Sequence, residues 1–467
     1  MDGKEFIKTI MGMSKMSKKF ELIKFFLKQG KKIAFEADET VVTYLDLVSQ
    51  IYSKQKKLYD FGVRKGNKIF IDLENCLDFI YLYFACYLSQ VTIIPISNKY
   101  NNIEKKEIIN LSKPDFIYNN VLKKTKWSKI KKNKFYKKNK SLAIFYTSGS
   151  TAEPKGVCHD LDNLILNAIE FNKHNKLNRD VRFLHFLPMG YMAGFLNSIL
   201  SPILTGGTII ILKKFNALTA FKLIDTIIEK KINVIWLIPS IVNYLSEIRC
   251  SNLKKKLFKL HLKKIFVGTA PFHERIKKNF YKKFKIRALE SYGMTELLLI
   301  SSNRHGFKEF GSGKILNNVK IKINKCNEIF IKSKFAFLGY FLNNKIINFK
   351  KNRWFSTGDL GVIKDNCLKI EGRKKNIIIK NGINISQAKI ENELLKIKEI
   401  KKCFIKSEEL SNGKTIINAF LETKNNNNKN LVKKISDKLN KNYLPDKFIF
   451  LKKIPVNHIG KVNLRNL

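Results

Sequence analysis

One loop decides how this 467-residue chain is interpreted: YTSGSTAEPKG, residues Tyr146–Gly156. It directly follows the apolar run Leu142 to Phe145 and gathers hydroxyl groups, small residues and one lysine. Such a loop can bring backbone N–H groups, hydroxyls and an ammonium onto a polyphosphate, which needs many donors and close approach. It is not a Walker loop, because Lys155 precedes Gly156 and the G-x-x-x-x-G-K-[ST] spacing is missing. Taken alone, the loop also fits a polar surface turn between a strand and a helix.

Four further segments follow this loop in order. They are SYGMTE (Ser291–Glu296), WFSTGD (Trp354–Asp359), GRKKN (Gly372–Asn376) and IGK (Ile459–Lys461). Together with the first loop, they resemble the motifs of the adenylate-forming (AMP-binding) superfamily, which includes acyl-CoA synthetases, peptide adenylation domains and luciferases. The resemblance runs from Tyr44 to Arg465, so it covers most of the chain.

The apolar pattern predicts an α/β fold. Strand-like runs such as Lys68–Leu73 and Val234–Ile238 alternate with stretches of helical periodicity. This alternation indicates mainly parallel sheets flanked by helices. The length exceeds what one compact core holds. The resemblance implies a large N-terminal AMP-binding domain, residues 1–372, and a small mobile α+β lid, residues 373–467, with a hinge near Lys375.

The chain is strongly basic, with a formal net charge of +51 from 89 basic and 38 acidic residues. A nucleic-acid-binding protein would gather its cations on one face. Here lysines occur in every region, beside abundant asparagine, isoleucine and phenylalanine, which is a pattern that genome composition explains. We therefore expect no dedicated nucleic-acid partner. A positive field can still steer ATP and CoA, both polyanions, toward the protein.

The cysteines and the apolar segments indicate in which cellular compartment the protein is expected. The 7 cysteines are scattered without a C-x-x-C pair, which favours a reducing compartment over a disulfide framework. The segment Leu77–Ile96 is apolar but interrupted by Asp78, so it predicts a buried helix and a strand rather than a transmembrane segment. Asp2 and Glu5 disfavour a signal peptide. We expect a cytoplasmic protein, with organellar targeting left open.

The resemblance assigns residues to the phosphates of ATP and to a metal ion. An adenylating enzyme lets a carboxylate attack the α-phosphorus of ATP and expel pyrophosphate, so its site must supply positive charge and in-line positioning. Glu296 would coordinate Mg²⁺, which prefers carboxylate and phosphate oxygens. Thr295 would contact the α-phosphate, and Tyr292 would lie against the adenine ring. The β- and γ-phosphates would be held by Thr147, Ser148, Ser150, Thr151 and Lys155.

Four other positions would complete the nucleotide site. Asp359 would accept hydrogen bonds from both ribose hydroxyls, since the paired oxygens of a carboxylate suit a vicinal diol. Arg373 would support the same sugar from the domain boundary, and Gly268 would mark where the backbone passes between nucleotide and acyl group. Lys461 would bridge the attacking carboxylate and the α-phosphate, although on composition alone it is one more surface lysine.

The acid and its acceptor are less defined. Gly382 would flank the tunnel that admits a pantetheine thiol; CoA is the expected acceptor, and the phosphopantetheine of an acidic carrier protein is the alternative. No aspartate near Pro188–Gly194 is present to hold an amino group, which disfavours an amino acid. The predicted acyl pocket is aromatic and apolar and suits a fatty or aryl acid; its members are Tyr191, Phe195, Trp236 and Ile238. Two of these, Phe195 and Trp236, equally fit an ordinary core.

These features together predict an ATP-dependent carboxylic acid ligase that forms an acyl-adenylate, releases pyrophosphate and transfers the acyl group to a thiol. Its partner would be a small-molecule carboxylic acid. A non-catalytic nucleotide-binding protein is the alternative from another class. It is disfavoured because the chain retains every charged motif residue: Lys155, Glu296, Asp359, Arg373 and Lys461.

Overall fold

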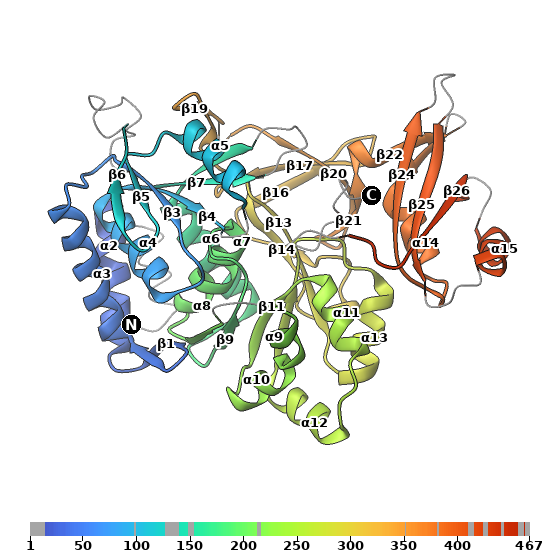
Figure 1. Ribbon diagram of the computed structural model, residues 1–467, viewed down its shortest axis with the longest axis horizontal. Helices are drawn as coiled ribbons and strands as arrows, with labels where there is room; N and C mark the ends of the chain where they lie inside the picture. The colour runs from blue at the N-terminus through green and yellow to red at the C-terminus, as the bar shows by residue number, and fades with distance from the viewer. Residues whose placement is uncertain are drawn as a thin grey trace.

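The structure is a computed structural model that describes residues 15–97, 100–126, 140–147, 154–212, 216–350, 352–380, 383–409, 415–423, 428–439, 443–455 and 462. Two large sheets with their helices make up the body of the molecule, and a smaller unit follows toward the C-terminus (Figure 1). The predicted α/β class, with large sheets flanked by helices, is confirmed. The sheets are parallel at their centres only, and antiparallel strands extend them at the edges.

The first sheet has 13 strands and carries most of the motif residues. Its parallel centre consists of β1 (Ile33–Ala37), β10 (Thr208–Ile211), β9 (Arg182–His185), β11 (Val234–Leu237), β12 (Lys264–Val267) and β13 (Ala288–Met294). Antiparallel strands complete it: β2 (Thr40–Thr43), β14 (Leu298–Ser302), β15 (Lys314–Ile315), β16 (Val319–Ile323), β17 (Glu328–Ser333), β20 (Phe355–Lys364) and β21 (Cys367–Arg373). β13 is therefore the strand at which parallel pairing gives way to antiparallel pairing.

The second sheet has 8 strands. Parallel pairing joins β3 (Lys68–Asp72), β4 (Thr92–Ile96), β5 (Phe116–Tyr118) and β7 (Leu142–Thr147). Antiparallel pairing adds β6 (Leu122–Lys124), β8 (Lys155–Asp160), β18 (Gly339–Leu342) and β19 (Lys345–Asn348). Because β18 returns from much later in the chain, this sheet brings residues near 340 beside the first motif loop.

Helices cover both sheets. They are α2 (Lys15–Gln29), α3 (Tyr44–Asp60), α4 (Leu77–Ser89), α5 (Asn102–Ser112), α6 (Leu161–Asn175), α7 (Met192–Phe195), the π-helix η2 (Leu196–Leu200), α8 (Ser201–Ile203), α9 (Ala217–Phe221), α10 (Leu223–Glu229), α11 (Pro239–Glu247), α12 (Asn252–His261), α13 (Glu274–Phe284) and the short 3₁₀ turn η3 (Gly306–Lys308). Local sequence defines their ends. Thr43 and Asp46, for example, form a reciprocal capping box that starts α3.

The apolar segment Leu77–Ile96 forms a buried helix followed by a strand, as predicted. α4 is buried almost all round, and β4 follows it. Its rings pack against α7 and η2, where Tyr83 and Phe195 stack with centroids 3.6 Å apart. In the described residues, no helix combines the length and apolar character that crossing a membrane requires.

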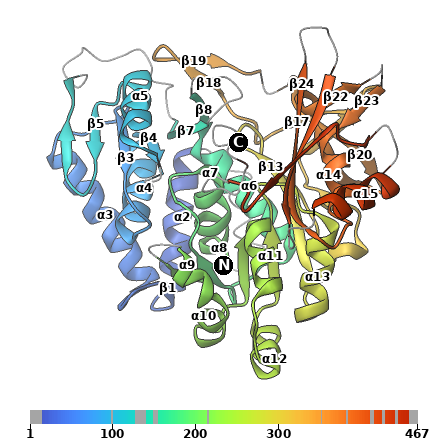
Figure 2. The ribbon, with the colours of Figure 1, turned by 45° about the vertical axis from the view of Figure 1, so that its right-hand side comes forward.

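The small unit consists of η4 (Lys374–Asn376), β22 (Ile377–Lys380), β23 (Ile383–Ser386), α14 (Gln387–Leu394), β24 (Ile400–Glu409), β25 (Thr415–Thr423), α15 (Asn428–Lys438) and β26 (Lys447–Leu451). Its buried apolar residues form a cluster of their own, separate from the clusters of the body. Figure 2 brings this unit forward and shows α14 next to α13 of the body.

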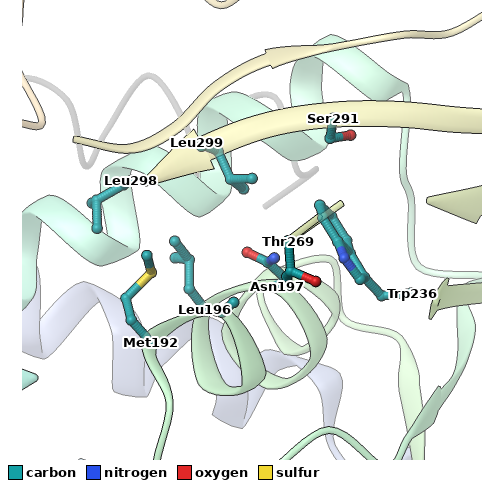
Figure 3. Close-up of a pocket in the computed structure, with 10 residues that line it drawn as sticks. Met192, Leu196, Asn197, Trp236, Thr269, Ser291, Leu298 and Leu299 are labelled. Carbon is teal, nitrogen blue, oxygen red and sulfur yellow. The ribbon is translucent and has the colours of Figure 1, made fainter. Parts of the chain in front are cut away.

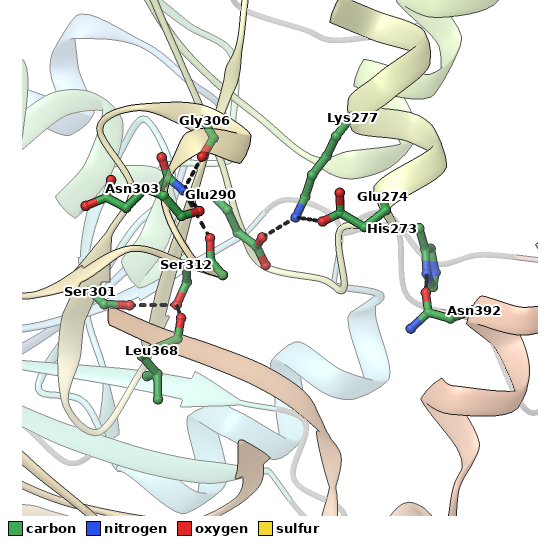
Figure 4. Close-up of polar contacts among 12 residues, drawn as sticks. His273, Glu274, Lys277, Glu290, Ser301, Asn303, Gly306, Ser312, Leu368 and Asn392 are labelled. Carbon is green, nitrogen blue, oxygen red and sulfur yellow. Dashed lines mark hydrogen bonds and ion pairs between the residues drawn. The ribbon is translucent and has the colours of Figure 1, made fainter. Parts of the chain in front are cut away.

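Two side chains at the N-terminal end of α13 contact the small unit. His273 Nδ1 lies 2.6 Å from Asn392 Oδ1 (Figure 4). Arg275 donates hydrogen bonds to the carbonyl oxygens of Leu395, Ile397 and Ile400, at 2.7, 3.1 and 2.7 Å. These carbonyls lie at and beyond the C-terminal end of α14, where a helix leaves its last carbonyl groups without intrahelical partners. The body thus supplies a cap to a helix of the small unit.

One carboxyl group of the small unit predicts a pH effect on stability. Glu391 Oε1 accepts hydrogen bonds from Gln387 Nε2 and the Ile405 amide, at 2.9 and 3.0 Å, and burial raises the pKa of Glu391 to about 7. Because this folded-state pKa lies above that of the unfolded chain, the contribution of Glu391 to stability is fully present below the unfolded pKa of about 4.3 and is lost as the pH rises through about 7.

We expect Glu391→Gln to lessen the fall in melting temperature between pH 5 and pH 8, since an amide cannot ionise. Thermal unfolding of both proteins across this range measures it. Glu393→Gln, on the same helix and paired with Lys396 at the surface, is the matched control and should keep the wild-type pH response. An equal pH response in Glu391→Gln and wild type would refute the assignment.

Candidate active site

The ends of the first motif loop are held together by strand pairing. β7 and β8 pair antiparallel with Thr147 opposite Lys155 and Tyr146 opposite Gly156. A Cβ atom at Gly156 would lie 3.0 Å from Ile144 Cγ2 and 3.2 Å from Phe341 Cβ, so glycine lets β8 fit between β7 and β18. The predicted phosphate-binding residues Ser148, Ser150 and Thr151 lie outside the described residues.

A buried carboxylate joins three motifs that are distant in the sequence. Asp359 lies opposite Arg373 in the pairing of β20 with β21, and Arg373 Nε donates to Asp359 Oδ1 at 2.7 Å. The Tyr292 hydroxyl donates to Asp359 Oδ2 at 2.6 Å. Asp359 is 4% exposed, so these charge-assisted bonds offset the cost of burying its charge. The sequence predicted all three residues; their direct connection through Asp359 was not predicted.

The state of Tyr292 follows from the same contacts. Burial first, and then the charge of Asp359, raise the pKa of the Tyr292 hydroxyl well above its usual range. Tyr292 therefore keeps its proton and donates to Asp359 at neutral pH. The position of Tyr292 on β13 matters as well, because successive residues of a strand point to opposite faces of the sheet. Tyr292 faces Asp359, whereas its neighbours Ser291 and Gly293 line a cavity on the other side.

The predicted metal ligand, Glu296, lies in the turn between β13 and β14. The Tyr340 hydroxyl donates to Glu296 Oε1 at 3.0 Å, and the Phe337 amide donates to the Glu296 carbonyl at 2.8 Å. The adjacent Thr295 carbonyl lies 2.6 Å from His159 Nε2, on β8. This contact ties the turn to the strand that leaves the phosphate loop. Sequence reasoning missed Tyr340 and His159, because neither belongs to a motif.

A single oriented carboxylate fits Mg²⁺. This ion usually keeps several waters and binds through one or two carboxylates together with substrate phosphates. Within the described residues, no cluster of three or more His, Cys, Asp or Glu side chains could hold a metal without a substrate. Glu296 would thus bind the ion jointly with the phosphates of ATP.

We expect Tyr340→Phe to raise the Mg²⁺ concentration needed for half-maximal activity by about 10-fold, since outer-shell hydrogen bonds orient a metal ligand. Mg²⁺ titrations of ATP–pyrophosphate exchange measure this. Tyr52→Phe, at an exposed position on α3, is the control. A change in maximal rate without a shift in the Mg²⁺ midpoint would count against the role.

The predicted acyl-pocket residues are separated by the fold. Trp236 lines a cavity of about 50 Å³, but the other three are not among the residues that line it. Phe195 is fully buried and stacks on Tyr83, because its face of the helix points to α4. Ile238, the N-cap residue of α11, is partly buried and packs against the core, and the Tyr191 ring lies 6.0 Å from that of Tyr100.

Residues that the sequence reasoning missed line the cavity instead. Met192, Ala193, Leu196 and Asn197 share one helix face, and their helical spacing is a signal that could have identified them. Gly268 lies beside this cavity: a Cβ atom there would be 3.1 Å from the Ser291 carbonyl oxygen and 3.3 Å from Trp236 Cζ2.

The remaining predicted positions lie at or beyond the junction with the small unit. Lys375 is exposed in η4. Its neighbour Lys374 forms an ion pair with Glu328 on β17 at 2.9 Å. Gly382 and Lys461 lie outside the described residues.

Comparisons with known proteins point to one family. The family model described as AMP-binding enzyme matches residues 24–341. A 2-succinylbenzoate–CoA ligase of Oceanobacillus iheyensis is 27% identical over 411 residues, which cover 80% of this chain and 83% of that ligase. A 4-coumarate–CoA ligase-like protein of Arabidopsis thaliana is 30% identical over 281 residues, which cover 55% of this chain and 48% of that protein.

Solved structures show the same fold. The o-succinylbenzoate CoA synthetase of Bacillus subtilis, in complex with its acyl-adenylate intermediate, superposes with a TM-score of 0.78 at 22% identity, covering 95% of this chain and 97% of that one. ATP-bound MatB from Rhodopseudomonas palustris gives a TM-score of 0.81 at 21% identity, covering 94% and 97%.

The chain belongs to the AMP-binding enzyme family. Within that family, the predicted activity is confirmed: it is an ATP-dependent ligase that joins a carboxylic acid to a thiol through an acyl-adenylate. The description of the family model agrees with the predicted ATP, and the relatives named as CoA ligases agree with CoA as the thiol. The Bacillus subtilis synthetase has also been solved in complex with ATP and a magnesium ion, at 22% identity to this chain.

Proposed function

We propose that β13 divides the active site, with the nucleotide on the Tyr292 side and the acyl group on the side of Ser291 and Gly293. The observation that carries this proposal is the hydrogen bond from Tyr292 to Asp359 opposite the cavity. Asp359 would receive the ribose, supported by Arg373. The carboxylate would then meet the α-phosphate near Thr295, at the end of the strand.

The roles proposed for the remaining residues follow from their charges and, for Thr147, from its hydroxyl group. Thr147 and Lys155 would hold the phosphates, and Glu296 would share Mg²⁺ with them. Lys461 would neutralise the carboxylate and the α-phosphate as they approach. In this assignment the chain's own groups position two anions against each other, which is the main requirement of the first half-reaction.

The second half-reaction would use a rotation of the small domain, residues 373–467, against the AMP-binding domain, residues 1–372. Lys375 would be the hinge, and Gly382 would flank the path of the thiol. The separate apolar core of the small unit supports such movement. A carrier-protein phosphopantetheine is the alternative acceptor, for which the lysine-rich surface is suitable. Within the described residues none of the seven cysteines forms a disulfide, which is compatible with a reducing compartment such as the cytoplasm.

ATP–pyrophosphate exchange across fatty, aryl, short-chain and amino acids tests the first step. Several relatives are named for 2-succinylbenzoate, so this acid belongs in the panel. Exchange with one class of acid, followed by thioester formation with CoA but not with a carrier protein, is the expected result. Folded protein that binds ATP yet exchanges with no acid would overturn the proposal.

A further inference from the structure

The cavity beside β13 has a divided lining (Figure 3). Its apolar part is formed by Met192, Leu196, Leu298 and Leu299. The amide of Asn197 and the indole of Trp236 lie at its other part, on either side of Thr269. None of the residues that line the cavity is ionisable. A bound group in this space would therefore meet methyl groups and neutral hydrogen-bonding atoms.

Two polar atoms of this lining have no hydrogen-bond partner in the described part of the chain. They are Asn197 Oδ1 and Trp236 Nε1, on side chains that are 4% and 2% exposed. Buried polar atoms are nearly always paired, because an unpaired one keeps the full cost of losing water. One of these atoms accepts a hydrogen bond and the other donates one. A ligand that fills the cavity would satisfy both by offering a donor and an acceptor.

The backbone at the cavity is strained at one point. Thr269, which follows Gly268, has φ of +74°, a region that β-branched residues rarely adopt. Strain of this kind concentrates at ligand sites, where the surrounding structure maintains it. The strained residue and the two unpaired polar atoms thus border the same space.

The size of the cavity limits what it admits. A water molecule needs about 10–15 Å³ of such space, so about 50 Å³ holds roughly four water-sized groups.

The lining also limits which chemical groups a ligand can place in the cavity. A second carboxylate would lack a cationic partner in this lining and would place its charge next to Asn197 Oδ1. A ketone would leave Asn197 Oδ1 unpaired, because it cannot donate. A hydroxyl group can both donate and accept.

We propose that the acid activated by this enzyme is compact, uncharged beyond its reacting carboxylate, and hydroxylated, and that Asn197 and Trp236 recognise its hydroxyl group. The proposal rests on the acyl site assigned under the proposed function. It makes Asn197 and Trp236 residues that determine specificity. It also separates this chain from those relatives whose names specify 2-succinylbenzoate, an acid with a second carboxylate.

The test compares acids that differ by one hydroxyl group. ATP–pyrophosphate exchange is measured with 3-hydroxybutyrate and butyrate, with 3-hydroxypropionate and propionate, and with 2-succinylbenzoate. We expect kcat/KM to be at least about 10-fold higher for the hydroxylated member of the preferred pair, since a site built to bond a hydroxyl rejects the analogue that lacks it. 2-Succinylbenzoate should be a poor substrate.

Two variants link this preference to the cavity. Asn197→Leu should lower kcat/KM for the hydroxy acid by about 10-fold or more and change that for its deoxy partner by less than about 3-fold. Trp236→Phe removes the indole N–H donor together with one ring of the indole, and it should act in the same direction. Asn243→Leu, on α11 outside the cavity, is the control. Calorimetric binding of the hydroxy acid, measured without ATP, should weaken in both cavity variants.

The outcomes separate this inference from the activity on which it rests. Exchange with no acid would overturn the proposed function. Exchange that favours the deoxy acids or 2-succinylbenzoate would overturn the hydroxy-acid inference and leave the function intact. An unchanged preference in folded Asn197→Leu and Trp236→Phe would also overturn the hydroxy-acid inference. Melting temperatures establish that both variants are folded.

Discussion

Replacing Lys461 by alanine is expected to slow ATP–pyrophosphate exchange by about 100- to 1000-fold, by analogy with the loss of a donor that stabilises a transition state. The first half-reaction brings a carboxylate anion to a polyphosphate. A cation 4 Å from one of these charges contributes about 4 kcal/mol at an effective dielectric of about 20. Alanine removes that contribution at the point where the charges meet.

A second measurement distinguishes this role from general damage. Transfer to CoA from preformed acyl-adenylate should change little in Lys461→Ala, because the proposed rotation of residues 373–467 would carry Lys461 away from the α-phosphate before the thiolate attacks the acyl carbon and AMP leaves. Lys452→Ala, an exposed lysine of the same region, should leave both rates unchanged. Equal losses in both half-reactions would assign Lys461 to folding or domain closure instead.

Asp359→Asn is expected to lower kcat/KM for ATP by about 100-fold or more, since hydrogen bonds to a charged group contribute about 1.5–3 kcal/mol each. The amide replaces one acceptor oxygen by a donor, which faces either the Tyr292 hydroxyl or the Arg373 guanidinium. It also removes the negative charge that balances Arg373. The ribose of ATP would then lose the Asp359 carboxylate as its hydrogen-bond acceptor, and the Tyr292 hydroxyl and the Arg373 guanidinium would no longer be held in place around it.

Steady-state kinetics with varied ATP, together with direct nucleotide binding, measure this effect. Asp365→Asn, at an exposed turn between β20 and β21, is the control and should behave like wild type. Because Asp359 is buried, the melting temperature of the variant must be recorded with its kinetics. Unaltered ATP affinity in a folded variant would remove Asp359 from the nucleotide site.

The sequence predicted the motif residues because each motif is local. Tyr292, Asp359 and Arg373 each lie in a short string that can be recognised without knowing the fold. The contacts of Tyr340 with Glu296 and of His159 with Thr295 join strands that are distant in the chain, so no local pattern contains them. Their prediction would have required the strand order of both sheets.

The cavity beside β13 shows a second limit. Phe195 was predicted as an acyl-pocket residue or an ordinary core residue; in the structure Phe195 stacks on Tyr83, and its neighbour Leu196 lines the cavity, because consecutive residues of a helix point about 100° apart. Of the two large aromatic residues named, Phe195 packs in the core and Trp236 lines the cavity. The cavity is also lined by smaller side chains and by Asn197, whose buried Oδ1 has no hydrogen-bond partner among the described residues.

The cap that Arg275 provides has a consequence for the timing of catalysis. It joins the large body to the C-terminal end of α14, so the two units cannot separate without leaving those carbonyls to water. A net preference of about 2 kcal/mol, within the range for such bonds, would keep roughly 30 molecules in this orientation for each one that has left it. The hydrogen bonds of Arg275 would have to break before the small domain could rotate as proposed. The rate at which they break would therefore set an upper limit on the turnover rate of the enzyme.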